Sequence, residues 1–210
     1  MTGPSLGKGG GASINIISET DVWSYRHDRD NEDFVDAINA SVAKLQEDFK
    51  DIMDSVNFVY AAELGGIDRS STLGYYSSDG YIAINREYTD IGKMNAIYDA
   101  SVATHFHPGR GSYTGTEAVT FHEMGHALTG HIAEKMGAAD MYDAAQKIVD
   151  AAYKAVHGKG GTLAWAGTIS GYAQDSYAEC IAEAVADHYC NGDGAAKASK
   201  AIWNQLKKYM

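Results

Sequence analysis

The sequence predicts an α+β fold, in which one helix precedes a small mixed sheet and several helices form the second half. Between residues 56 and 85, short apolar or alternating stretches are separated by Gly, Ser and Asp, as in strands joined by turns. From residue 94 onward, apolar residues recur at three- and four-residue steps, as on the buried faces of helices. Strands followed by a run of helices are typical of the α+β class.

The chain has 210 residues, of which 45% are hydrophobic, and this is enough for one domain with a buried core. Residues 1–13 are rich in glycine, which loses much backbone entropy on ordering. We therefore expect a flexible leader at residues 1–13 and a single domain at residues 14–210.

The net charge of the chain argues against nucleic acids and anionic membranes as binding partners. The chain has 28 acidic and 17 basic side chains, for a formal net charge of −11. Nucleic acids and anionic membranes bind concentrated positive charge, so we expect neither as a partner. No apolar run approaches the roughly 18 residues of a membrane span, and the N-terminus lacks the apolar region of a signal peptide. These features predict no signal peptide and a cytoplasmic location.

The first half of the chain predicts one helix and a hairpin. Apolar residues at helical spacing predict a helix at 31–49, with Asp30 and Asn31 as its caps. Residues 56–64 are a strand candidate. Residues 73–76 and 81–85 (YIAIN) are predicted to form a hairpin with its turn at 77–80.

The second half predicts helices separated by glycine-rich breaks at 158–161 and 191–194. Thr114 and Glu117 have the spacing of a capping box, which places a helix at about 117–135. The other helices are expected at 94–105, 139–157, 176–189 and 195–208. Cys180 and Cys190 would lie about 15 Å apart along one of these helices, too far for a disulfide, so we expect reduced thiols.

The strongest chemical signal is the HEMGH sequence at residues 122–126. Two histidines four residues apart lie on the same face of a helix, so His122 and His126 can bind one metal ion. Glu123 follows the first ligand directly and is placed to act as a general base on water. A catalytic zinc site commonly has three protein ligands, so a third must come from elsewhere in the chain.

Glu179 is the best candidate for the third ligand. His131 lies nine residues after His122, which is about half a turn around the same helix and unsuited to the same ion. Glu179 and Glu183 share one face of a helix rich in Ala, Ile and Val, where an unpaired carboxylate is costly. We expect Glu179 to bind zinc and Glu183 to accept a hydrogen bond from the outer nitrogen of a ligand histidine. The opposite assignment, with Glu183 as the ligand, remains open from the sequence.

Three other histidines are weaker candidates for site residues. His105 and His107 flank Phe106 at the end of a predicted helix, where they either border the substrate cleft, bind a second ion or serve the structure. The last reading is favoured by their place in a loop. His188 lies nine residues after Glu179, on the far side of the predicted helix, and is expected to be non-catalytic.

HEMGH followed by Glu179-x-x-x-Glu183 on a later helix resembles the zinc site of gluzincin-type metallopeptidases. The segment from Ser170 to Glu183 is similar to the anthrax lethal factor-like branch, in which a tyrosine seven residues before the ligand glutamate points at the scissile carbonyl. Tyr172 stands at that spacing, so the resemblance implies that it stabilises the oxyanion. It also implies a zincin-like fold. The chain departs from the pattern at Cys180 and Ile181, which replace a more usual bulky aromatic residue.

More weakly, the YIAIN strand and the THFHPG segment at 104–109 resemble small zincin domains of bacteriophages and prophages. Some of those domains sit at the ends of phage head proteins, so the resemblance implies phage head proteins as partners and a virion-associated location as an alternative to the bacterial host cytoplasm.

The sequence thus predicts a zinc-dependent metalloendopeptidase with one Zn²⁺ ion and a peptide or protein substrate. The ligands are His122, His126 and Glu179, and the catalytic residues are Glu123 and Tyr172. If the YIAIN strand is the sheet edge beside the cleft, it can hold an extended peptide by backbone pairing. The alternatives are a phage virion or head-assembly protein that retains the zinc site with little or no proteolysis, and a metal-stabilised binding module.

Overall fold

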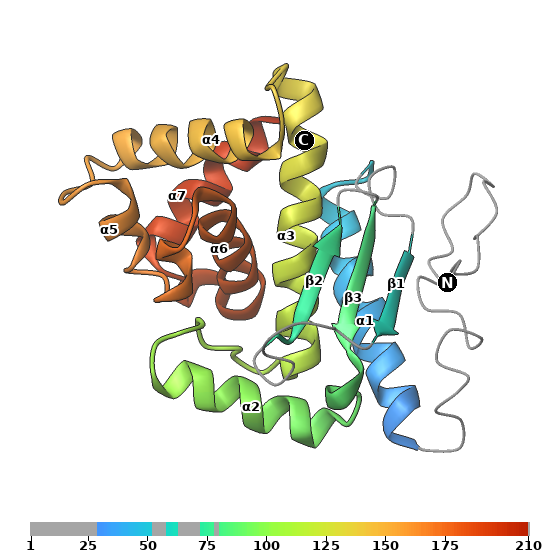
Figure 1. The fold of residues 1–210 in the computed structure, drawn as a ribbon. Helices are drawn as coiled ribbons and strands as arrows, with labels where there is room; N and C mark the ends of the chain where they lie inside the picture. Colours follow the sequence, from blue (N-terminus) through green and yellow to red (C-terminus); the bar gives the residue numbers. More distant parts are fainter. Residues whose placement is uncertain (1–28, 52–57, 63–71, 78–79, 210) are drawn as a thin grey trace.

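The computed structural model describes residues 29–51, 58–62, 72–77 and 80–209, and the predicted leader lies outside them. Within these residues, the first half holds α1 (Arg29–Asp48), β1 (Phe58–Ala62), β2 (Gly74–Ser77) and β3 (Tyr81–Asn85). The second half holds α2 (Ile91–Ala103), α3 (Gly115–Met136), α4 (Met141–Ala155), α5 (Thr162–Ala166), α6 (Tyr177–Asn191) and α7 (Lys197–Leu206). This mostly helical chain with a small sheet is compatible with the predicted α+β class (Figure 1).

The described strands form one mixed sheet in the order β1-β3-β2. β2 and β3 are antiparallel, and Gly80 N–H donates to Ser77 O over 2.8 Å, which confirms the predicted hairpin and its turn. Gly80 has a φ of 83°, a left-handed conformation that glycine adopts without strain. β1 pairs with β3 in parallel.

The prediction that YIAIN could be the sheet edge is wrong, because β3 lies between the other two described strands. Its side chains fit that central place, since Ile82 and Ile84 are fully buried. Among the described strands, β2 is the edge that lies beside α3 (Figure 1). The parallel partner of β3 is β1, which precedes the hairpin in the chain. The pattern within YIAIN does not indicate this pairing.

Helix α3 is the centre of the structure and contacts the sheet, α1, α2, α4 and α6 (Figure 1). It begins with the predicted capping box, in which Thr114 and Glu117 bond each other's backbone N–H groups. It ends at Gly137, whose φ of 62° is the left-handed conformation common after a helix. Most of its residues are buried, so α3 carries its polar side chains into the interior.

Helices α3 and α6 approach each other closely at Gly125. A Cβ atom at this position would lie 2.8 Å from Ala182 Cα, closer than real Cβ contacts allow, and 3.3 Å from Val185 Cβ, which is a tight contact. Gly125 is three residues after His122, and Ala182 is three residues after Glu179. The two small residues therefore let the backbones meet at the level of the predicted ligands.

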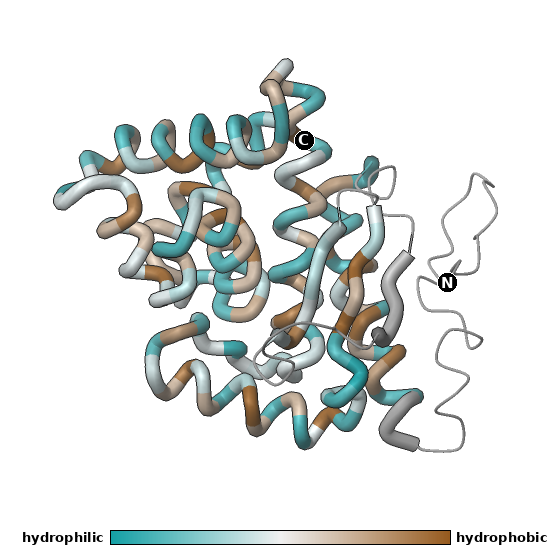
Figure 2. Tube along the Cα trace, in the orientation of Figure 1, coloured by the Kyte–Doolittle hydropathy of each residue, from teal (hydrophilic) through white to brown (hydrophobic). Residues whose placement is uncertain are grey.

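The remaining helices cover this core through amphipathic faces. Figure 2 shows hydrophilic and hydrophobic residues alternating along α2 and α4, as expected for helices with one buried side. Helix α1 begins at Arg29, so Asp30 and Asn31 lie inside it and the prediction that they cap it is wrong. The short α5 follows the predicted glycine-rich break at 158–161 and was not predicted. No helix among the described residues is both long and apolar enough to cross a membrane.

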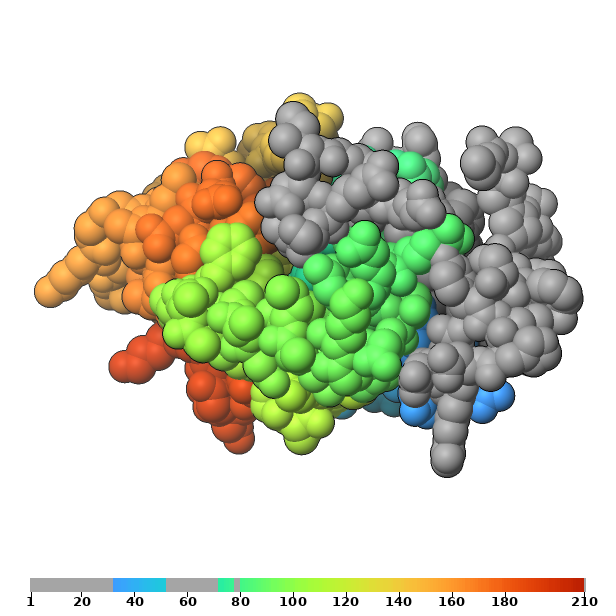
Figure 3. Space-filling model, turned by 60° about the horizontal axis from the view of Figure 1, so that its bottom comes forward, coloured from blue at the N-terminus to red at the C-terminus, as the bar shows by residue number. Residues whose placement is uncertain are grey.

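The segment after α2 forms backbone hydrogen bonds with the segment before α6. Gly171 N–H donates to His105 O over 2.6 Å, and Tyr172 N–H donates to Phe106 O over 3.1 Å. Figure 3 shows this yellow-green segment against the orange segment around α5. Both cysteines are buried free thiols, as predicted.

The close approach at Gly125 makes a prediction about stability. We expect Gly125→Ala to lower the free energy of unfolding by about 1–3 kcal/mol, because the added methyl group must push α3 and α6 apart. Urea denaturation followed by circular dichroism measures the change. Gly130→Ala on the same helix is the control, since its Cβ would meet only Tyr76 Oη at 3.6 Å. Equal stability of the two variants would contradict the packing argument.

Candidate metal centre

Three side chains from α3 and α6 converge at the contact between these helices. His122 Nε2 lies 3.1 Å from Glu179 Oε2, and His126 Nε2 lies 3.4 Å from the same oxygen. The ligand atoms that the three residues offer all lie within 4.8 Å of one another. The structure therefore brings together the three residues that the sequence predicts as metal ligands.

The donor atoms of this cluster fit a divalent cation. Glu179 Oε2 is buried without a well-directed hydrogen bond to any described residue, although two imidazole nitrogens face it. Burial raises the pKa of Glu179, but the neighbouring His122 and His126 outweigh it and hold the pKa well below its usual value. An ionised oxygen and two imidazole nitrogens form the His₂Glu donor set of catalytic zinc sites, which also keep a position for water. The residues present thus fit zinc.

Glu179 is positioned by the start of α6. Ser176 caps this helix, and its Oγ accepts a hydrogen bond from Glu179 N–H over 3.1 Å. Glu179 consequently sits in the first helical turn, where the positive end of the helix dipole favours a carboxylate.

Glu183 is fully buried and binds the outer nitrogen of His122. Its Oε1 accepts hydrogen bonds from His122 Nδ1 over 2.7 Å and from His107 Nδ1 over 3.0 Å. Its Oε2 accepts one from Ser170 Oγ over 2.7 Å. Burial raises the pKa of Glu183, but the bonds from His107 and His122 outweigh it and lower the pKa to about 2.

The contact with Glu183 determines the tautomer of neutral His122. A carboxylate only accepts, so the proton of the neutral imidazole lies on Nδ1 and Nε2 offers its lone pair on the side of Glu179. Glu179, and not Glu183, faces the Nε2 atoms of both histidines. Of the two assignments left open by the sequence, the geometry thus corresponds to Glu179 as ligand and Glu183 as its support.

Glu123 lies between His122 and the edge strand β2. It is only 5% exposed, and burial raises the pKa of its carboxyl group. A Cβ at Gly74 would lie 2.6 Å from Glu123 Oε1 and 2.8 Å from Val119 Cγ1. Only glycine lets β2 come this close, and the strand in turn limits the positions open to Glu123.

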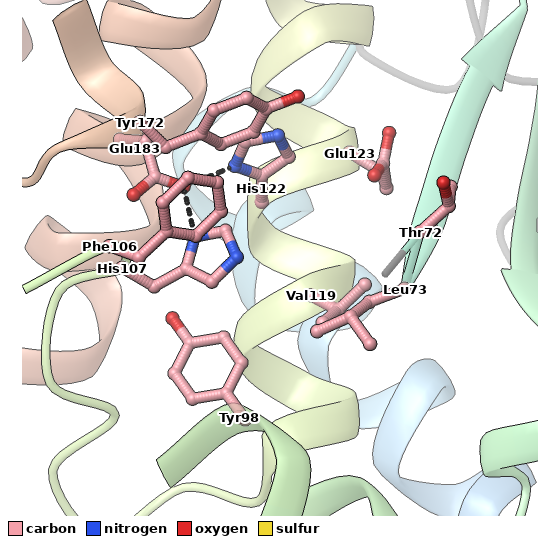
Figure 4. A pocket seen from close by; sticks show the side chains of 11 residues that line it. Thr72, Leu73, Tyr98, Phe106, His107, Val119, His122, Glu123, Tyr172 and Glu183 are labelled. Atoms are coloured by element: carbon pink, nitrogen blue, oxygen red, sulfur yellow. Dashed lines mark hydrogen bonds and ion pairs between the residues drawn. The ribbon is translucent and has the colours of Figure 1, made fainter. Parts of the chain in front are cut away.

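Tyr172 stacks on His122 with 5.7 Å between ring centroids and an interplanar angle of 10°. It lies in a short 3₁₀ turn (Tyr172–Gln174), and its ring also neighbours Phe106, with centroids 5.0 Å apart, and His107, with centroids 5.6 Å apart. Burial, together with the carboxylates of Glu179 and Glu123, raises the pKa of Tyr172 well above its usual value, so its hydroxyl keeps its proton. In Figure 4 this hydroxyl points towards the side of the pocket where Glu123 lies.

His126 is held differently from His122. Its Nδ1 is buried without a hydrogen-bond partner among the described residues. Its ring instead stacks on Tyr76 of β2, with centroids 6.5 Å apart and an interplanar angle of 16°. Each candidate ligand imidazole therefore packs against one tyrosine, but only His122 also has a carboxylate at its outer nitrogen, Nδ1.

A pocket opens beside these residues (Figure 4). His122, Glu123, Tyr172 and Glu183 form one part of its lining, and further residues come from the sheet edge, α2 and the segment after α2. The pocket lies next to His122, a candidate metal ligand, and a molecule bound in it would contact Glu123 and Tyr172.

Sequence reasoning gave little weight to three residues of this site. The sequence favours a structural role for His107, and the structure places it in the lining of the pocket, where it bonds Glu183. Its neighbour His105 turns away and contacts Gly167 O through Nε2 at 3.1 Å, so the two histidines do not share an ion. Ser170 and Gly74 gave no chemical signal, because serine and glycine are common in turns.

His188 of α6, which is expected to be non-catalytic, lies away from the candidate metal centre in a packing contact. His188 stacks on Trp203 with 4.0 Å between ring centroids, and it packs between α6 and α7. His131 is outside the group of potential ligands in the described chain.

Comparison of the chain with protein-family models, with curated proteins and with solved structures gave no match. The functional argument consequently depends on the geometry and chemistry of the residues just described.

The geometry predicts which residues are needed for metal binding. We expect the wild-type protein to bind one zinc ion, and Glu179→Ala to weaken that binding at least tenfold, because the cluster loses its anionic ligand. Competition with a chromophoric chelator measures the affinity. His131→Ala, on the same helix as both histidines, should bind zinc like the wild type. Wild-type affinity in Glu179→Ala would show that the cluster is not the metal site.

Proposed function

We propose that this protein is a zinc-dependent metalloendopeptidase with a gluzincin-type site in a zincin-like fold. One observation carries the proposal: the two histidines of HEMGH and Glu179 of a distant helix converge, with Glu123 beside them in a pocket. A purely structural metal site has no need of a general base, which is the role that Glu123 can fill. Glu123 therefore favours an enzyme over a metal-stabilised scaffold.

His122, His126 and Glu179 would hold the zinc ion. When bound, zinc supplies the Lewis acid that makes water nucleophilic near neutral pH and polarises a peptide carbonyl. Glu183 supports the site by keeping the proton of His122 on Nδ1, so that Nε2 remains a ligand atom.

Glu123 is the proposed general base and acid. Burial raises the pKa of its carboxyl group, which makes it a stronger base than an exposed glutamate. It takes a proton from the attacking water and later donates this proton to the leaving amine.

Tyr172 is the proposed donor to the oxyanion. Its hydroxyl keeps its proton because burial and nearby carboxylates raise its pKa. Stacking against His122 and Phe106 fixes the ring before the substrate binds, which is the preorganisation that makes such donors effective.

The edge strand β2 supports a peptide as the substrate. Among the described strands it pairs with β3 on one side only, and its first residue, Gly74, contacts Glu123. An extended peptide that adds to β2 by backbone hydrogen bonds would pass beside Glu123. A phage head protein as partner is a further proposal, supported by the sequence resemblance alone.

Glu123→Gln tests the proposed reaction. We expect peptide hydrolysis to fall at least 100-fold, because the amide cannot accept the proton, while one zinc ion per chain is retained. A peptide-library digest followed by mass spectrometry, with metal analysis of the same samples, measures both quantities. If the wild type binds zinc but cleaves no peptide in a broad library, the peptidase proposal is wrong, and the protein is either a virion or assembly protein or a metal-stabilised binding module.

Tyr172→Phe tests the oxyanion donor. We expect kcat to fall about 100-fold with KM nearly unchanged, because the hydroxyl acts on charge that develops in the transition state. The phenylalanine ring preserves the stacking on His122, so zinc affinity should not change. Steady-state kinetics on one peptide separates the two constants. A rise in KM at constant kcat would assign Tyr172 to substrate binding.

A further inference from the structure

The pocket lining contains a polar ring atom, of His107, that the proposed reaction does not use. In Figure 4 the His107 ring lies on the side of the pocket opposite Leu73 and Val119, and one ring nitrogen points across the pocket towards them. This is Nε2, since Nδ1 bonds Glu183 Oε1 over 3.0 Å. Within the described chain Nε2 has no hydrogen-bond partner.

The contact with Glu183 determines what Nε2 offers to a ligand. Both Nδ1 atoms at Glu183 Oε1 belong to imidazoles, and a carboxylate oxygen can only accept hydrogen bonds from them. The proton of neutral His107 therefore lies on Nδ1, which leaves Nε2 as an acceptor. The ring is also held in place, because it stacks on Tyr98 with centroids 5.3 Å apart and an interplanar angle of 7°.

The rest of the lining near His107 is apolar or already bonded. Leu73 and Val119 form one wall, and the Tyr98 hydroxyl donates to Pro108 O over 3.2 Å. Both oxygens of Glu183 accept hydrogen bonds from other residues. No Lys or Arg is among the described residues that line the pocket.

We propose that this pocket is a specificity subsite for a neutral side chain with an apolar body and a hydroxyl or N–H donor, such as tyrosine or threonine. His107 is the residue that selects it, and the inference rests on the proposed function. A purely apolar side chain would bury Nε2 without a partner, which costs binding energy. An acidic side chain would place a second negative charge beside Glu123, and no Lys or Arg among the described lining residues could pair with it.

Matched peptides test the subsite. In peptides that differ only as Tyr against Phe, or Thr against Val, at the positions next to the scissile bond, one position should show kcat/KM about tenfold higher for the hydroxyl residue. His107→Asn is the decisive variant, because the Asn amide can still donate to Glu183 from the place of Nδ1 but has nothing in the place of Nε2. We expect its preference ratio to fall to about one with zinc content unchanged.

His107→Phe removes both nitrogens and should lose the preference together with zinc affinity, whereas His107→Asn should lose the preference alone. A wild-type ratio of about one, or a ratio that survives in His107→Asn, would overturn the proposal. Because the measured quantity is a ratio between two peptides on the same protein, a general loss of activity in a variant does not imitate the expected result.

A binding experiment separates this inference from the proposed function. Glu123→Gln, loaded with zinc, should bind the Tyr peptide about tenfold more tightly than the Phe peptide in isothermal titration calorimetry, and the added His107→Asn change should abolish the difference. If the wild type cleaves nothing but this difference is present, the peptidase proposal fails and the subsite is correct. If peptides are cleaved but neither assay shows the preference, the subsite fails and the peptidase proposal is unaffected.

Discussion

The candidate site depends on how closely α3 and α6 approach each other. Gly125 of HEMGH lies against Ala182, with no room for a side chain between the two backbones. Because His122 and His126 flank Gly125 on one helix, and Glu179 and Glu183 flank Ala182 on the other, this contact sets the distance between imidazoles and carboxylates. A separation larger by one methyl group would exceed hydrogen-bonding distance for His122 and Glu183, which are 2.7 Å apart.

Glu183 connects the parts of the site that come from different segments. Its two oxygens accept hydrogen bonds from the candidate metal ligand His122, from His107 in the pocket lining and from Ser170. The Ser170 Oγ also accepts a hydrogen bond from Ala173 N–H. Ala173 belongs to the turn that carries Tyr172, so the proposed oxyanion donor and the proposed ligand share one support. A fully buried carboxylate is tolerated here because three donors compensate for its desolvation.

The sequence predicted the candidate ligands because their spacing along each helix is a local pattern. The HEMGH spacing places two imidazoles on one helix face. Two glutamates four residues apart on an apolar helix indicate a positively charged partner, because an unpaired buried carboxylate is costly. His107 was not predicted as part of this cluster, because a histidine in a loop has many structural uses and nothing local indicates Glu183, 76 residues later. The edge of the sheet was also missed, since the parallel pairing of β1 with β3 leaves no trace in the YIAIN pattern.

The sequence by itself determined the longer helices, the hairpin, the capping box of α3 and the candidate donor set, because each follows from periodicity or from fixed spacing along one element. Only the tertiary structure decided that Glu179 faces both Nε2 atoms, that Glu183 binds the outer nitrogen of His122, and that β2 borders Glu123. The physical reason is that these relations depend on the distance and rotation between separate elements. Packing of small residues sets both quantities, and it acts between parts of the chain that are far apart in sequence.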